Sequence, residues 1–152
     1  MSTAPNLTPI SVPDYLHAET NARHRHEYVE GVVYAMVGAS NFHNLIASNA
    51  TGILHRELRA KRWRVFNSDT NVRVRRVRGT RFYYPDAMVV CQFNPSVDTF
   101  QDSPVVIVEV LSESTRRTDE NEKREAYLSI DSVLVYVRVE QSVAVVLVDR
   151  RT

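Results

Sequence analysis

The sequence predicts an α/β (α+β) fold, in which a mixed β-sheet is flanked by helices, because two hydrophobic periods alternate along the chain. Between residues 41 and 61 apolar side chains recur every three or four positions, which is typical of an amphipathic helix. From Arg64 the period drops to two, as in a half-buried strand. Residues 105–111 are apolar on both faces, as in a central strand that is covered on both sides.

Length and composition favour one globular domain. The 152 residues are 43% hydrophobic and 24% charged, with a net charge of +1. Residues 1–13 are polar and contain three prolines, so we expect a flexible arm there and a single domain over residues 14–152. The start has no signal-peptide pattern, and no apolar run approaches the roughly 18 residues that cross a bilayer. The one cysteine, Cys91, cannot form an intramolecular disulfide, and we expect a cytoplasmic protein.

Three helices are expected, each with a candidate capping residue. Ser40 is a good N-cap for the longest, and Asp119, with Glu122 three residues on, fits a capping box. Gly52 weakens the longest helix by about 1 kcal/mol relative to alanine, unless the glycine is there to allow close packing on a sheet. The helices are expected over residues 14–26, with Asp14 as N-cap, 41–61 and 119–130.

The strands are expected as short runs separated by polar turns. Residues 28–36 have the pattern of a hairpin that turns at Glu30 and Gly31. A second hairpin is expected at the C-terminal end, with its turn at residues 140–142. The remaining expected strands cover 72–77, 82–91, 105–111, 133–139 and 143–148, with a loop over 92–103.

Three charged residues stand where a charge is costly. Glu109 interrupts the apolar strand 105–111, where an unpaired carboxylate is strongly destabilising. Asp86 follows Pro85, which marks a strand start or bulge from which an aspartate can project. Lys123 precedes apolar residues at helical spacing, on the buried stripe of its helix. Each residue has an ordinary alternative explanation when it is considered alone. Glu109 could pair with a buried basic side chain or lie at a sheet edge, Asp86 could be a turn aspartate, and Lys123 could extend its ammonium to solvent.

One chemistry explains all three if they converge. Asp86 and Glu109 supply hard oxygen ligands suited to Mg²⁺ or Mn²⁺. Such an ion polarises a phosphoryl oxygen and lowers the pKa of a bound water. Lys123 can orient or activate that water and offset the negative charge that develops. Hydrolysis of a phosphodiester needs these elements.

The sequence blocks around these residues form a recognisable order. YYPDAMVVC (83–91), PVVIVEVLS (104–112) and DENEKREAY (119–127) follow one another, and weaker blocks stand at 26–32 and 43–44. Together they resemble the Uma-two family of restriction endonucleases, within the PD-(D/E)xK nuclease superfamily. The resemblance covers about residues 14–149 and implies a restriction-endonuclease-like, PD-(D/E)xK nuclease domain.

The resemblance also implies roles for individual residues. Leu111 stands where the superfamily pattern has its lysine, but the family places that lysine on the following helix, which Lys123 matches. Glu27 matches an acidic residue near the metal, with Glu30 as the fallback. The backbone carbonyl of Val110 is implied as a further metal contact. Departures from the family pattern at His26, Val32 and Glu113 leave the Asp-Glu-Lys set intact.

Basic residues are concentrated in one part of the chain. Between Arg56 and Arg81 there are ten Lys or Arg and two acidic residues, although the net charge of the whole chain is only +1. Arginines on a hairpin can contact a phosphate backbone, and a solvated strand face is an equal alternative. The candidate nucleic-acid contacts are Arg73, Arg75, Arg76 and Arg78.

The histidines favour no zinc site. His24 and His26 lack further Cys or Asp ligands at the spacing of a zinc site. His43, near the start of the long helix, is a candidate neighbour of the active site.

The leading hypothesis is an endonuclease that depends on Mg²⁺ or Mn²⁺ and cleaves nucleic acid, with DNA as the expected substrate. In it Asp86 and Glu109 bind the metal, Lys123 assists the water, and Glu27 supports the site. The first alternative is a nucleic-acid-binding or assembly module with the same fold and no turnover, which would bind without metal. The second is a hydrolase of small phosphate compounds, which would need a closed pocket. The β-rich C-terminus is compatible with a homodimer.

Overall fold

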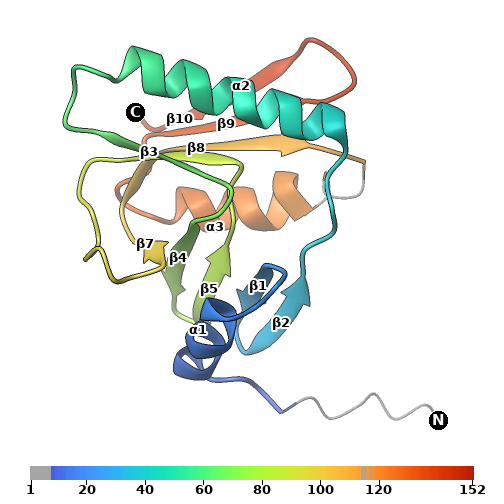
Figure 1. The fold of residues 1–152 in the computed structure, drawn as a ribbon, viewed down its shortest axis with the longest axis vertical. Coiled ribbons are helices and arrows are strands. Elements are labelled where there is room, and N and C mark those ends of the chain that lie inside the picture. The colour runs from blue at the N-terminus through green and yellow to red at the C-terminus, as the bar shows by residue number, and fades with distance from the viewer. Residues whose placement is uncertain (1–7, 114–115, 117) are drawn as a thin grey trace.

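The computed structural model describes residues 8–113, 116 and 118–152, with only the backbone described for residues 118–120. In this part of the chain the strands form two five-stranded sheets, accompanied by helices (Figure 1). The expected fold class is therefore confirmed. The elements are α1 (Val12–Thr20), β1 (His26–Val29), β2 (Val32–Ala35), α2 (Asn41–Glu57), β3 (Arg64–Asn67), β4 (Asn71–Arg76), β5 (Gly79–Tyr83), β6 (Ala87–Val90), β7 (Phe100–Gln101), β8 (Pro104–Leu111), the π-helical turn η1 (Thr118–Lys123), α3 (Arg124–Leu128), β9 (Val135–Glu140) and β10 (Val146–Arg150).

Both sheets are mixed. The first has the order β2-β1-β5-β4-β7, in which β4 and β7 are parallel. The second has the order β10-β9-β8-β6-β3, in which β8 and β9 are parallel. From top to bottom in Figure 1 the layers are α2, the second sheet, α3, the first sheet and α1. The expected central strand, β8, lies in the middle of the second sheet.

The main core lies between the two sheets and includes α3. It joins Val74 of β4, Tyr83 of β5 and Ile107 of β8 to Tyr127 of α3 and Tyr136 of β9, all fully buried. The rings of Tyr127 and Tyr136 meet edge to face with their centroids 5.4 Å apart, a favourable aromatic geometry. A second cluster lies where α1 packs on the first sheet, and consists of Tyr15, Tyr28, Phe82 and Phe100.

The chain passes from the first sheet to the second at Pro85. The prediction of one strand over 82–91 is wrong, because β5 ends at Tyr83 and β6 begins at Ala87. Proline has no N–H to donate to a sheet ladder, so strand pairing stops there. Asp86 is thereby left at the corner between the sheets, outside both ladders.

The first hairpin turns where the sequence predicted. Glu30 and Gly31 both have positive φ, 51° and 99°, between the paired residues Val29 and Val32. A two-residue turn of this handedness matches the twist of the flanking strands. A Cβ added at Gly31 would lie 2.8 Å from the Cβ of Pro9, so glycine is required on steric grounds as well.

The first helix differs from its expected bounds. It begins at Val12 because Ser11, not Asp14, is the N-cap, and the Ser11 hydroxyl accepts the backbone N–H of Asp14. It ends at Thr20 rather than at 26, because His26 already belongs to β1.

The long helix α2 begins after its predicted cap, Ser40, and ends at Glu57 rather than at 61. A Cβ added at Gly52 would meet nothing within 4 Å. The alternative that this glycine allows close packing on a sheet is therefore excluded. None of the helices in the described part of the chain is long and apolar enough to span a bilayer.

The C-terminal third departs from expectation in local geometry. The helix expected over 119–130 is a π-helical turn, η1, followed by α3, and the expected cap, the side chain of Asp119, lies outside the described residues. The loop expected over 92–103 contains the short strand β7. The second strand of the last hairpin begins at Val146, three residues later than expected.

Candidate active site

The residues predicted to carry chemistry line one cleft of about 650 Å³. They arrive there from different elements, because the cleft opens where the two sheets meet. Glu27 comes from β1, Asp86 from the corner after β5, Glu109 and Val110 from β8, and Lys123 from the end of η1.

Asp86 completes the hydrogen bonding of the central strand. The β6–β8 ladder pairs Ala87 with Val108, and beyond that pair the chain of β6 has turned away at the corner. The Asp86 Oδ2 accepts the backbone N–H of Val110 at 2.7 Å in place of a strand carbonyl. The carboxylate is thus fixed beside the strand residue whose carbonyl the family resemblance implies as a metal contact.

Glu109 is buried in the central strand, with 3% of its surface exposed. The strand lies between β6 and β9, so the alternative of a glutamate at a sheet edge is wrong. The hydroxyl of Tyr127 donates to Glu109 Oε1 at 2.8 Å. Burial and the nearby Glu109 carboxylate raise the pKa of Tyr127, so the phenol keeps the proton that it donates.

Lys123 points inward, with 7% of its surface exposed, so it does not snorkel to solvent. Its Nζ lies 2.8 Å from Glu27 Oε1 and 3.9 Å from Glu109 Oε1. It also lies 5.5 Å from the centre of the Tyr83 ring. The ammonium therefore faces two carboxylates from two different sheets and offsets their charge.

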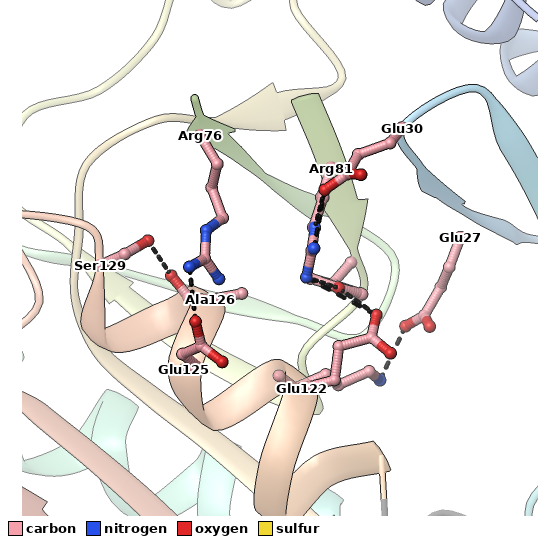
Figure 2. A network of polar contacts seen from close by, with 10 residues as sticks. Glu27, Glu30, Arg76, Arg81, Glu122, Glu125, Ala126 and Ser129 are labelled. Atoms are coloured by element: carbon pink, nitrogen blue, oxygen red, sulfur yellow. Dashed lines mark hydrogen bonds and ion pairs between the residues drawn. The ribbon is translucent and has the colours of Figure 1, made fainter. Parts of the chain in front are cut away.

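Glu30, the fallback for Glu27, belongs to a separate network beside the cleft (Figure 2). It accepts from Arg81 Nη2 at 2.7 Å, and Arg81 Nη1 also contacts the hydroxyl of Tyr83. That hydroxyl donates to Glu122 at 2.7 Å. Glu27 lines the cleft, whereas Glu30 holds the β1–β2 turn to β5.

The arginines of the β4–β5 hairpin lie apart from the cleft, and none of the four predicted contacts is among its lining residues. Arg73 binds Asp102 through two hydrogen bonds of 2.7 Å each, and Arg76 binds Glu125 at 2.6 Å (Figure 2). The other two, Arg75 and Arg78, are exposed.

His43 reaches the cleft from the first turn of α2. Its Nε2 lies 3.4 Å from Asp86 Oδ2. The Asp86 carboxylate raises the pKa of His43, against the opposite effect of burial, and the backbone of Val110 adds to the rise. Its Nδ1 is buried without a hydrogen-bond partner among the described residues. The prediction that His43 lies near the site is confirmed.

Several polar residues at the cleft were not predicted from the sequence. Arg25 and Asp69, 44 positions apart, form an ion pair of 2.8 Å at its rim. Tyr84 lines the cleft and donates to the buried Glu19 at 3.0 Å. No spacing in the sequence links these residues, because the contacts form only when β1, β3 and β5 come together. A tyrosine on the buried stripe of the last helix, Tyr127, was a readable signal for a polar partner.

The cleft is acidic among the described residues that line it. Four carboxylates, from Glu27, Asp69, Asp86 and Glu109, face two cations, Arg25 and Lys123, besides His43. A polyanion would be repelled here unless a cation were added. No three His, Cys, Asp or Glu side chains in the described part of the chain are grouped closely enough to hold a metal ion as they stand.

The fold and the cleft define a restriction-endonuclease-like protein. A model of the Uma2 family, described as "Putative restriction endonuclease", matches residues 12–152, and the chain belongs to this family. The resemblance drawn from the sequence blocks is thereby confirmed. The description of the family supports a nuclease.

Similar proteins cover most of the chain. Two come from Synechocystis sp. (strain ATCC 27184 / PCC 6803 / Kazusa). Uncharacterized protein sll1609 is 29% identical over 135 residues, which is 87% of this chain and 75% of that protein. Uncharacterized protein slr1290 is 32% identical over 124 residues, which is 81% of this chain but only 63% of that protein.

A solved structure shares the fold. It is described as a "putative nuclease belonging to DUF820" from Anabaena variabilis ATCC 29413. The two structures superpose with a TM-score of 0.73 over 93% of this chain and 80% of the other. At 17% sequence identity the likeness shows a common fold.

Proposed function

We propose that the protein is a divalent-metal-dependent endonuclease that hydrolyses phosphodiester bonds in nucleic acid, with DNA as the substrate. One observation carries the proposal: Asp86, Glu109 and Lys123 come from three separate parts of the chain to one cleft. Two of them are almost completely buried there, Glu109 at 3% and Lys123 at 7% exposure. Buried charges are rarely kept for stability alone, so a functional role is the better explanation.

The donors fit a hard divalent cation. Carboxylate oxygens from Asp86 and Glu109, with the carbonyl of Val110, are the ligand types that Mg²⁺ and Mn²⁺ prefer. The acidic cleft supplies the charge that a cation would neutralise, and this would in turn permit a phosphodiester to approach. Closing such a ligand set requires side-chain movements, because no three-ligand group is preformed among the described residues.

The residues of the chain then have distinct tasks. A bound Mg²⁺ or Mn²⁺ would supply an activated water and polarise the phosphoryl oxygen. Val110 and Tyr127 hold the two carboxylates in position through hydrogen bonds of 2.7 and 2.8 Å. Lys123, kept in place by Glu27 at 2.8 Å, orients the water and offsets the charge that develops on the phosphate.

The proposal is tested by cleavage of labelled single- and double-stranded DNA and RNA with Mg²⁺ or Mn²⁺. Lys123→Met should slow cleavage by about 100-fold or more while Mn²⁺ still binds, because the lysine acts on the reaction and not as a ligand. Asp86→Ala should abolish both cleavage and Mn²⁺ binding in titration calorimetry. The control Lys61→Met changes an exposed lysine and should leave both unchanged. Full metal-dependent cleavage by Glu109→Ala would show that the site is assigned wrongly.

We also propose a homodimer, because apolar side chains lie exposed on one side of α2 and on the edge strand β10. They are about half exposed, and exposed groups of large apolar side chains often mark interaction surfaces. Light scattering after size exclusion would give the mass of the particle, and a monomer at micromolar concentration would rule the dimer out. The residues are Phe42, Leu45, Ile53, Val146 and Val148.

A further inference from the structure

We propose that His43 is a third side-chain ligand of the metal site and that its imidazole makes the site prefer Mn²⁺ to Mg²⁺. The inference rests on the proposed metal-dependent function. It adds a ligand that neither the superfamily pattern of the sequence blocks nor the family description assigns. The proposed function leaves the choice between Mg²⁺ and Mn²⁺ open, and this inference selects Mn²⁺.

The position of His43 is fixed by the start of α2. Its backbone N–H donates to the hydroxyl of the N-cap Ser40 at 3.1 Å, which anchors the first turn. From there the side chain reaches into the cleft, where it is 15% exposed. The imidazole is therefore delivered by the rigid end of a 17-residue helix and not by a loop.

The distance to Asp86 suits two ligands of one ion. Two donor atoms that each lie about 2.1 Å from a metal, at right angles, are about 3 Å apart. His43 Nε2 and Asp86 Oδ2 are 3.4 Å apart, so a small rotation of either side chain brings them to that spacing. The backbone of Val110, whose carbonyl is a proposed ligand, lies beside the same imidazole.

A purely structural role explains the ring poorly. A buried histidine that serves the scaffold normally has hydrogen bonds at both ring nitrogens. In His43 the Nδ1 is buried with no hydrogen-bond partner among the described residues, and Nε2 faces Asp86, with Asn44 and the backbone of Val110 as further neighbours of the ring. The ring is thus directed at a proposed metal ligand and not at the fold.

The strand β8 divides the site into two halves. Successive side chains of a strand point to opposite faces, so Glu109 faces α3 while Val110 faces α2. Lys123 and Glu27 lie with Glu109, whereas His43 lies with Asp86 and Val110. His43 would therefore approach the ion from the side of Asp86, whereas Glu109 would reach it from the side of the lysine that assists the water.

An imidazole ligand changes which cation binds best. Mg²⁺ strongly prefers oxygen ligands, whereas Mn²⁺ accepts nitrogen more readily. Removing the ring should therefore weaken Mn²⁺ binding by about 10-fold and Mg²⁺ binding much less. A site made of carboxylates and a carbonyl alone would lose neither.

The test is electron spin echo spectroscopy of Mn²⁺ bound to the full chain, with titration calorimetry of Mn²⁺ and Mg²⁺. The wild type should show nitrogen coupling from a coordinated imidazole, and His43→Ala should lose it together with the selective loss of Mn²⁺ affinity. The control is His55→Ala, an exposed histidine on the same helix, which should retain both.

The outcomes separate the two proposals. Mn²⁺ binding without nitrogen coupling in the wild type would overturn the role of His43 and leave the metal site standing. Absence of Mn²⁺ binding to the wild type, with and without an oligonucleotide, would overturn the metal-dependent function itself. If His43→Ala does not fold, His43→Gln takes its place. The spectrum of the wild type also tests the role of His43 by itself, because its nitrogen coupling is measured without a variant.

Discussion

Single residues at the cleft show how buried charge is stabilised in this protein. Glu109 is almost fully buried, yet it accepts from the Tyr127 hydroxyl at 2.8 Å and lies 3.9 Å from the Lys123 ammonium. Lys123 is held in turn by Glu27. Removing one member of such a set leaves the others unpaired, which costs more than the interaction itself stabilises.

We predict that Tyr127→Phe lowers the free energy of unfolding by about 1–3 kcal/mol, because Glu109 loses a donor while it stays buried. The shape of the ring is preserved, so packing against Tyr136 should be kept. Urea unfolding measures the change. The control Tyr34→Phe alters a tyrosine that is 52% exposed, and it should be neutral. Equal stability of Tyr127→Phe and the wild type would mean that the hydroxyl contributes nothing to holding Glu109.

At the scale of elements, one aspartate ties α3 to the last hairpin. Asp149 of β10 accepts from Arg124 of α3 at 2.7 Å and from Arg138 of β9 at 2.9 Å. The hydrogen bond from Arg124, followed by the charge of Arg138, lowers the pKa of Asp149, although burial opposes this. A carboxyl group whose pKa is lower in the folded state stabilises the fold above its unfolded pKa and loses this effect as the pH falls.

Asp149→Asn should therefore lower the free energy of unfolding by about 1 kcal/mol at pH 7. The difference from the wild type should shrink as the pH falls below about 3.9, where the unfolded aspartate becomes protonated. Urea unfolding at a series of pH values from 7 to 3 measures both. Asp131→Asn, in an exposed turn, is the matched control. A difference that is constant across this range would show that charge is not the cause.

Two glycines give opposite expectations for the same substitution. Gly52→Ala should stabilise the protein by about 0.5–1 kcal/mol, because α2 gains helix propensity and the new Cβ meets nothing within 4 Å. Gly31→Ala should destabilise it by at least about 1 kcal/mol, because φ is 99° and Pro9 blocks the Cβ at 2.8 Å. Thermal unfolding of the two variants measures this, and a shift of the same sign in both would contradict it.

At the scale of the whole molecule, the basic β4–β5 hairpin is only partly available to a polyanion. Arg73 and Arg76 already neutralise Asp102 and Glu125, while Arg75 and Arg78 are exposed. Binding to nucleic acid through this hairpin should therefore depend on the exposed pair. The alternative function is a nucleic-acid-binding module that needs no metal. It requires binding through this hairpin even when the carboxylates of the cleft are substituted.

We predict that Arg75→Gln and Arg78→Gln each reduce the salt dependence of nucleic-acid binding by about 0.9 in the slope of log K against log salt. Fluorescence anisotropy with a labelled oligonucleotide measures this slope. The salt concentration is varied from about 50 to about 200 mM, a range that includes physiological ionic strength. Arg73→Gln should instead lower stability through the loss of its pair with Asp102. Binding by Asp86→Ala without metal, combined with no cleavage by the wild type, would favour the binding module.

The sequence by itself determined the fold class, the family and the three charged residues. Alternating hydrophobic periods specify helices and strands, and a charge inside an apolar stripe signals a partner, as Glu109 and Lys123 show. Pro85 indicated a strand start or bulge, whereas the structure has a break between two sheets at this position.

Only the tertiary structure decided which residues meet. Glu27 faces Lys123, whereas Glu30 faces Arg81. Arg25 and Asp69 pair across 44 positions, and His43 meets Asp86 across the sheet boundary. Periodicity records which face of an element is buried, but it does not record which element lies opposite. Partners that come from separate sheets are therefore fixed by packing alone.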